Sequence, residues 1–193
     1  ADTDTSTVKH YCLTANHCIS SNNTAQNIQF YWRFRTSSCN GSCPSNTGWP
    51  YKTAGAVVRA TGSAGDFTLL EASTAPPSGS VYMAFNNAPV ANTNGVALHR
   101  VSNPIFGPQV YSEQSVDTSA PTCSGLPRGQ IIYSRDTLGG TDGGSSGSPV
   151  TGSVAVSSRM LACAAPSSFA FWPRLWWRAM SSSRTSVAVS ASR

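Results

Sequence analysis

Short apolar runs recur along the first 150 residues, each five to eight residues long and rich in β-branched and aromatic side chains. They read "VKHYCLTA", "IQFYWRFR", "AGAVVRA", "DFTLLE", "VYMAF", "GVALHRV" and "QIIYS". Stretches rich in Gly, Pro, Asn and Ser separate them, which is typical of antiparallel strands joined by surface loops. We therefore predict an all-β chain, built as an antiparallel barrel or sandwich, with no long helix in this region.

A glycine-rich stretch, "GGTDGGSSGSPV" at 139–150, interrupts this alternation. One interpretation is a flexible Gly/Ser linker that carries no chemistry. The other is a tight turn in which the amides of Gly144 and Ser146 point into one cavity, because glycines on both sides of the serine permit unusual backbone angles. The strand-like runs before and after it favour the turn, since a linker inside a barrel has no domains to connect.

A nucleophilic serine needs a base to take its proton and a carboxylate to orient that base. The chain has three histidines. His10 and His99 lie in strand-like runs and are interpreted as structural, whereas His17 in "CLTANHC" lies where a run passes into a turn. Asp66 in "GDFTLLE" stands at the mouth of an apolar run, where burial is costly unless the carboxylate is paired. An ordinary turn aspartate is the alternative for Asp66.

Taken in order, "LTANHC", "GDFTLLE" and "GGSSGSPV" resemble the motifs of chymotrypsin-fold serine peptidases, and most closely those of bacterial lysyl endopeptidases. The resemblance implies two six-stranded antiparallel barrels. It also implies that His17 is the general base, Asp66 its orienting partner and Ser146 the nucleophile, with the amides of Gly144 and Ser146 as the oxyanion hole. It implies no metal and no cofactor.

The resemblance also suggests a substrate preference. Lysyl endopeptidases have an acidic residue four positions before the nucleophile, and Asp142 occupies that position in this chain. We therefore expect Asp142 to contribute to binding a basic residue, lysine first and arginine second, on the amino side of the cleaved bond. A plain turn role in "TDGG" is the alternative. The second acid that these enzymes carry further downstream has no counterpart, since no Asp or Glu follows Asp142.

Both ends of the chain depart from the family pattern. Only sixteen residues precede His17, so we expect Cys18 to lack the upstream cysteine with which it normally pairs in the family, and Cys12 is a conceivable substitute. After Gly152 there is no glycine, although the family expects a glycine-bearing strand that walls the pocket. We therefore expect barrels that are incomplete at both ends, with residues 1–150 forming the catalytic core as two half-barrels.

Residues 151–193 differ in amino-acid composition from the rest of the chain and are dominated by Ser, Ala, Arg and Trp. A reading-frame shift in the coding DNA would produce such a break. The formal net charge of +5 comes from this region, because acidic and basic residues balance up to position 142 and five arginines follow. A cationic tail that binds nucleic acid or membrane is an alternative, but its apolar residues show no sustained helical stripe.

Composition bears on where the protein works and on what it binds. Only 11% of residues are charged. The six cysteines are consistent with an oxidising compartment and up to three disulfides, whose pairing the sequence leaves open. The cysteines and histidines do not show the spacing that is typical of a zinc site. We expect a secreted, extracellular bacterial serine endopeptidase. It would act as a monomer on polypeptides and bind neither nucleic acid nor membrane. The alternative is a truncated, weakly active or inactive protease-like barrel that serves as a binding module.

Overall fold

The computed structural model describes residues 9–43, 52–80, 82, 89–152 and 158–160. Almost all regular structure in them is β, as the apolar runs predict. In chain order the elements are β1 Tyr11–Thr14, α1 Asn22–Gln26, β2 Gln29–Tyr31, β3 Lys52–Ala54, β4 Ala56–Gly62, β5 Phe67–Ala72, β6 Ala97–Ser102, the 3-10 turn η2 Pro104–Phe106, β7 Val110–Val116, β8 Ser134–Leu138, β9 Pro149–Gly152 and β10 Ser158–Met160.

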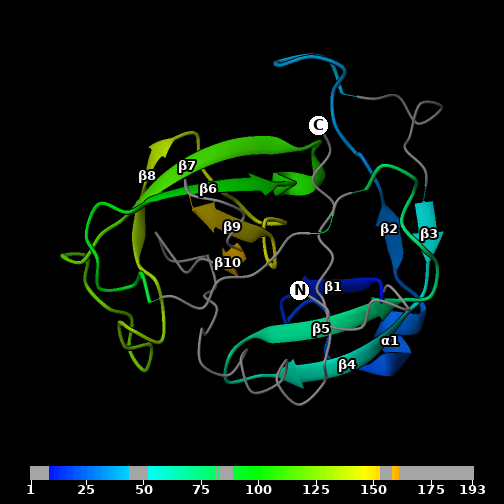
Figure 1. The fold of residues 1–193 in the computed structure, drawn as a ribbon, viewed down its shortest axis with the longest axis horizontal. Coiled ribbons are helices and arrows are strands. Elements are labelled where there is room, and N and C mark those ends of the chain that lie inside the picture. Colours follow the sequence, from blue (N-terminus) through cyan, green and yellow to red (C-terminus); the bar gives the residue numbers. More distant parts are fainter. Residues whose placement is uncertain (1–8, 44–51, 81, 83–88, 153–157, 161–193) are drawn as a thin grey trace.

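The strands form two main antiparallel sheets and one small one. The first sheet has the order β1-β5-β4, the second has the order β10-β9-β6-β7-β8, and β2 pairs only with β3. In Figure 1 the first sheet lies at the bottom in blue to teal, and the second lies above it in green to brown. Each main sheet belongs to one half of the sequence, so a site between them must combine residues distant in the chain.

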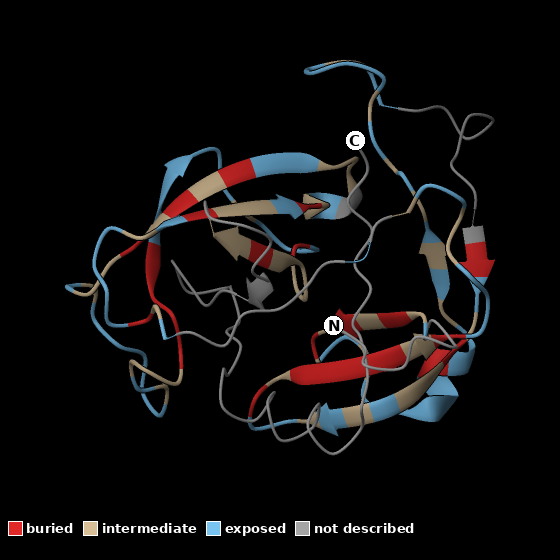
Figure 2. Cartoon of the chain, in the orientation of Figure 1, coloured by how far each residue is buried: buried red, intermediate tan, exposed pale blue. Residues whose placement is uncertain are grey.

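The first sheet packs around β5, the most apolar strand of this half. Figure 2 shows β5 almost entirely buried. Leu70 forms a cluster with Ala25 of α1 and Ala56 of β4, joined by partly buried side chains such as Ile19. The single-turn helix α1 is capped by Ser21, whose hydroxyl accepts from the Thr24 amide at 3.3 Å. This packing fixes the register of β1 on β5 and hence where the chain leaves β1.

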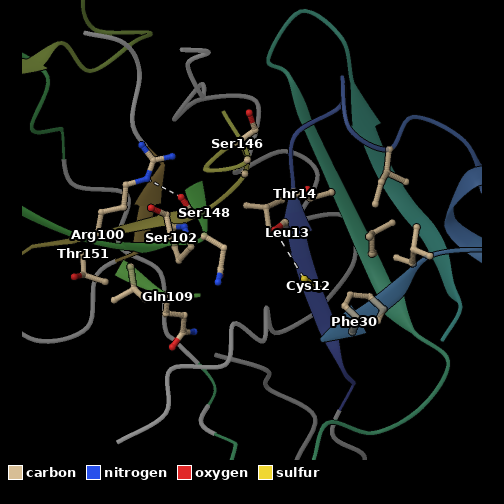
Figure 3. Close-up of a pocket in the computed structure, with 18 of the residues that line it drawn as sticks. Cys12, Leu13, Thr14, Phe30, Arg100, Ser102, Gln109, Ser146, Ser148 and Thr151 are labelled. Carbon is tan, nitrogen blue, oxygen red and sulfur yellow. Dashed lines mark hydrogen bonds between the residues drawn. The ribbon is translucent and has the colours of Figure 1, made fainter. Parts of the chain in front are cut away.

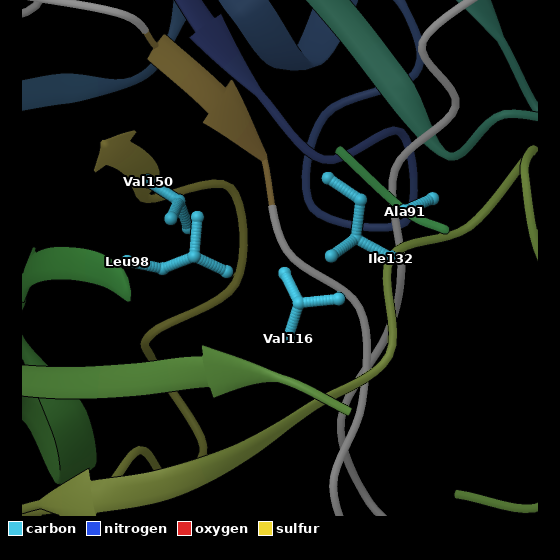
Figure 4. Packing of buried hydrophobic residues seen from close by; sticks show 5 residues of the cluster. All are labelled: Ala91, Leu98, Val116, Ile132 and Val150. Atoms are coloured by element: carbon cyan, nitrogen blue, oxygen red, sulfur yellow. The ribbon is translucent and has the colours of Figure 1, made fainter. Parts of the chain in front are cut away.

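The second sheet has its own apolar core. Leu98 of β6, Val116 of β7 and Val150 of β9 pack with Ala91 and Ile132 (Figure 4). Because Val150 is the last residue of the glycine-rich stretch, its burial ties the end of that stretch to the sheet.

The two six-stranded barrels that the resemblance implies are not seen in the described residues, in which no sheet closes. The reason lies in the strands available to the first half. In the described part of the segment between α1 and β4, the strands are β2 and β3, three residues each, which pair with one another and not with β1-β5-β4. Within the residues that the structure describes, the all-β class and the lack of a long helix are confirmed, since the α-helix α1 has five residues.

One strand prediction needs correction, one observed strand was not predicted, and one prediction cannot be followed. The run "QIIYS" is buried but irregular, and the strand next to it, β8, begins only at Ser134. The strand β7 lacks an apolar run, because its inward positions include Ser112 and Gln114 while Tyr111 is exposed. The run "VYMAF" lies outside the described residues except for Tyr82.

Five cysteines lie in the described residues and are free thiols, so the disulfides expected from the cysteine count, including one between Cys12 and Cys18, are not seen among them. Cys12 is partly buried, and burial raises the pKa of its thiol to about 11. Cys18 is exposed, and its pKa is raised by partial burial and by the negative charge of Asp66. The sixth cysteine, Cys163, lies outside the described residues.

No helix among the described residues is both long enough and apolar enough to cross a membrane.

Candidate active site

His17 is held in a short turn immediately after β1. The amides of Cys18 and Ile19 both donate to the carbonyl of Ala15, each at 3.2 Å, which closes the turn around the histidine. Asn16 anchors the same turn to β4, because its side-chain amide donates to the Thr61 hydroxyl at 2.7 Å. The end of a buried strand and two flanking anchors therefore fix the position of His17.

Asp66 lies in the connection between β4 and β5, at the end of the first sheet where His17 also lies. Its φ of +45° is in the left-handed region, which aspartate adopts more readily than most residues. Its amide donates to the Ser63 carbonyl at 3.2 Å. In this conformation the carboxylate faces His17 and reaches it with both oxygens.

The His17–Asp66 contact has two hydrogen bonds. The His17 main-chain amide donates to Asp66 Oδ1 at 2.9 Å, and His17 Nδ1 donates to Asp66 Oδ2 at 2.7 Å. The His17 side chain is 38% exposed and that of Asp66 is 18% exposed, so the pair is accessible from solvent on the histidine side. With the proton held on Nδ1, Nε2 is the basic nitrogen of the neutral ring. This arrangement is suited to accepting a proton from a hydroxyl.

Ser146 lies in a turn with left-handed glycines on both sides. Gly144 has φ +93° and Gly147 has φ +76°, conformations that side chains rarely allow. The turn is closed by main-chain bonds from the Ser145 amide to the Asp142 carbonyl at 3.0 Å and from the Ser148 amide to the Ser145 carbonyl at 3.1 Å. The glycine-rich stretch is thus an ordered turn, as its strand-like flanks predicted, and not an extended linker.

This turn lies against the end of β1. A Cβ added to Gly147 would lie 2.7 Å from the Ala15 amide nitrogen and 2.9 Å from the Thr14 Cα, closer than real Cβ atoms approach. Ala15 is two residues before His17. The glycine at position 147 therefore permits the turn that bears Ser146 to contact the segment that bears His17.

A cavity of about 790 Å³ lies between the two main sheets. The first sheet, the α1 region and β2 contribute a largely apolar wall, which includes Leu13, Phe30 and Leu70. The second sheet contributes a polar wall, and Ser146 lines the cavity together with Gly144 (Figure 3). A substrate in this space would meet apolar side chains on one side and hydrogen-bonding groups on the other.

Asp142 is exposed and lies outside the cavity lining. Its carboxylate accepts from the Gly143 amide at 2.7 Å, and its carbonyl accepts from the Ser145 amide. Asp142 thus stabilises the start of the turn. Asp142 also lies four residues before Ser146 in the sequence.

The other two histidines contact tyrosines. His10 Nδ1 lies 2.6 Å from the Tyr82 hydroxyl, and His99 Nδ1 lies 2.6 Å from the Tyr111 hydroxyl, with each pair of rings stacked. The Tyr111 hydroxyl donates in turn to Glu113 at 2.8 Å.

Sequence reasoning missed Arg100, a charged residue within the run "VALHRV". Its side chain lines the cavity and donates to two groups of the serine turn, the Ser148 hydroxyl and the Ser145 carbonyl, each at 2.6 Å. The only signal in the sequence is a lone cation within an apolar strand, where burial demands partners. Those partners lie 45 and 48 residues further along the chain.

Two antiparallel sheets from successive halves of the chain, a His–Asp pair on the first and a glycine-flanked serine turn on the second define a protease domain of the chymotrypsin fold. Solved structures agree on this fold. The protease domain of MamO from Magnetospirillum magneticum has a TM-score of 0.53 at 16% identity, covering 89% of this chain and 84% of that one. Deg5 has a TM-score of 0.50 at 16% identity, covering 88% and 76%.

The family follows from the sequence. The family model described as lysyl endopeptidase, C-terminal domain, matches residues 1–162, and the chain belongs to that family. The lysyl endopeptidase of Pseudomonas aeruginosa is 30% identical over 112 residues, which are 58% of this chain. The match spans 24% of the length of that relative. The resemblance drawn from the three sequence motifs is thereby confirmed.

Proposed function

We propose that this domain is a serine endopeptidase that cleaves peptide bonds through an acyl-enzyme. Ser146 is the nucleophile, His17 Nε2 takes its proton, and Asp66 holds His17 in the required tautomer and orientation. The observation that carries the proposal is the pair of hydrogen bonds from His17 to Asp66, one of which comes from Nδ1. The contact between Gly147 and the end of β1 supports it, because it brings the serine turn against the histidine segment.

The reaction proceeds in two steps, acylation of Ser146 and hydrolysis of the acyl-enzyme. The Ser146 hydroxyl oxygen attacks the peptide carbonyl while its proton passes to His17, and His17 then gives the proton to the leaving amine as the C–N bond breaks. Water next attacks the acyl-enzyme by the same route and releases the carboxylic acid and Ser146. The amides of Gly144 and Ser146 stabilise the oxyanion in both steps.

A fluorophosphonate probe tests this proposal on the full chain. We expect covalent labelling that mass spectrometry maps to Ser146 and that is lost in His17→Ala. His10→Ala is the matched control, since His10 also bonds a neighbouring side chain but lies outside the site, and it should label at the wild-type rate. Folded protein that takes no label, or label that persists in His17→Ala, would reject the peptidase and leave a non-catalytic binding module.

We further propose that Asp142 favours substrates with lysine or arginine before the cleaved bond. The support is its position four residues before Ser146 and its exposed carboxylate. Asp142→Asn is the informative variant, because an amide oxygen can still accept from Gly143 while the charge is removed. We expect kcat/KM to fall more for lysyl esters than for norleucyl esters. Equal losses would assign Asp142 to the turn alone.

The domain is further proposed to act outside the cell as a monomer on polypeptides. The support is compositional: few charged residues and an even number of cysteines. Sedimentation of the purified chain and fractionation of its source cells test the two statements separately. A stable dimer, or exclusive recovery from the cytosol, would contradict them.

A further inference from the structure

The two proposed oxyanion donors belong to two peptide groups of the serine turn. A trans peptide is planar, so its C=O and N–H point in opposite directions. The direction of the Gly144 amide is therefore set by the Gly143 carbonyl, and that of the Ser146 amide by the Ser145 carbonyl. Whatever binds these two carbonyls also aims the two donors.

The Ser145 carbonyl is bound by three donors. Arg100 Nη2 donates to it at 2.6 Å, the Ser148 hydroxyl at 2.6 Å and the Ser148 amide at 3.1 Å. Arg100 Nε also donates to the Ser148 hydroxyl at 2.6 Å, a bond drawn as a dashed line in Figure 3. Arg100 thus reaches this carbonyl both directly and through Ser148.

The Gly143 carbonyl is bound by the amide of Ile105, at 2.6 Å. Ile105 lies in η2, directly after the end of β6, and its φ of +51° is unusual for a β-branched residue. Its side chain is 69% exposed, so packing of the side chain does not explain the conformation. The strained backbone instead directs the Ile105 amide at Gly143.

Arg100 is rigidly placed and carries its charge at neutral pH. Strand β6 lies between β7 and β9, with Arg100 opposite Ser112 and Val150. Burial lowers the pKa of the guanidinium to about 10, and the carboxylate of Asp136 opposes that shift. A charged donor polarises the carbonyl it binds, which makes the amide of the same peptide a stronger donor.

We propose that β6 and η2 form a device that aims the oxyanion hole, in which Arg100 is the positioning residue for the Ser146 amide and the Ile105 amide orients Gly144. This inference rests on the proposed peptidase function and adds the residue that organises its transition-state donors. In this proposal Arg100 acts on the reaction through the Ser145–Ser146 peptide, because its donors bind the Ser145 carbonyl and the Ser148 hydroxyl. No cofactor or second ligand is involved.

Arg100→Met tests the device by steady-state hydrolysis of a lysyl ester. We expect kcat to fall about 10²–10³-fold, the loss typical of one oxyanion donor, with KM within about threefold of wild type. Arg100→Lys should recover part of kcat, because one charged donor remains. Ser148→Ala should lower kcat by a smaller factor, since Arg100 still binds the Ser145 carbonyl.

Arg128→Met is the matched control. Arg128 also donates to two main-chain carbonyls, those of Asp117 and Ala120, and is partly buried, but both bonds lie within the loop before β8. It should lose stability without a change in kcat. Equal kcat losses in the two variants, or an Arg100→Met protein that folds and keeps its kcat, would overturn the proposal.

An NMR measurement separates this inference from the peptidase proposal. Arg100→Met should shift the Ser145 carbonyl carbon and the Ser146 amide, whereas Arg128→Met should leave both in place. If the wild-type chain hydrolyses nothing, the peptidase proposal fails while these shifts still decide whether Arg100 organises the turn. If Arg100→Met does not fold, the same shifts are read from Arg100→Lys and Ser148→Ala. Unchanged shifts in the folded variants reject the device.

Discussion

Replacing Gly147 by alanine should destabilise the domain through two separable effects. The first is backbone strain, because φ is +76° and an L side chain in that region costs about 1 kcal/mol. The second is overpacking, because the new Cβ would lie 2.7 Å from the Ala15 nitrogen and 2.9 Å from the Thr14 Cα. Both atoms are main chain and cannot rotate away, so this term is about 1–3 kcal/mol. Together they predict a loss of about 2–4 kcal/mol.

Gly125→Ala isolates the first effect. Gly125 has the same φ of +76° but no heavy atom within 4 Å of an added Cβ, so its substitution should cost only about 1 kcal/mol. Urea unfolding monitored by tryptophan fluorescence gives both free energies, with the slope m compared to confirm that the unfolded states match. The difference between the two variants measures the contact between the serine turn and β1.

Equal losses in the two variants would refute the close contact between the serine turn and the histidine segment. The contact also predicts a functional effect that stability alone does not produce. Gly147→Ala should slow fluorophosphonate labelling under conditions where the protein remains folded, because the turn moves away from β1, while Gly125→Ala should label at the wild-type rate.

Three further predictions concern single positions. Asp66→Asn keeps a residue that tolerates positive φ but presents an amide to His17, so we expect a folded protein with kcat reduced on the order of 10⁴-fold in ester hydrolysis. Ile105→Asn should raise the free energy of unfolding by about 1 kcal/mol because asparagine is less strained at φ +51°, whereas Val110→Asn in a strand should lower it. The pKa of Cys12 is raised from 9.0 to about 11, so as the pH rises the unfolded chain releases this proton before the folded chain does. The free energy of unfolding should therefore fall between about pH 9 and 11, and it should fall less in Cys12→Ala. Urea unfolding of both proteins across that pH range measures the difference.

Local patterns predicted the elements whose side chains follow the rule of apolar inside and polar outside. The runs around β1, β5 and β6 all yielded strands, and His17 lies shortly after β1 while Asp66 lies immediately before β5. The same rule failed for β7, whose inward positions hold Ser112 and Gln114. The Gln114 side-chain nitrogen donates to the Ser112 hydroxyl in the same strand and to Asp136 of β8, each at 3.1 Å, and the partner in β8 is one that a local pattern does not contain.

The order of three local motifs along the chain was enough to indicate the family, and the resemblance to that family then implied the His17–Asp66 pair. The cavity, the contact of Gly147 with β1 and the bonds of Arg100 and Ile105 to the serine turn required the tertiary structure. Each joins segments from different parts of the chain, and their partners meet only after the sheets have packed. Sequence by itself determined which groups are available for chemistry, and packing decided how those groups are aimed.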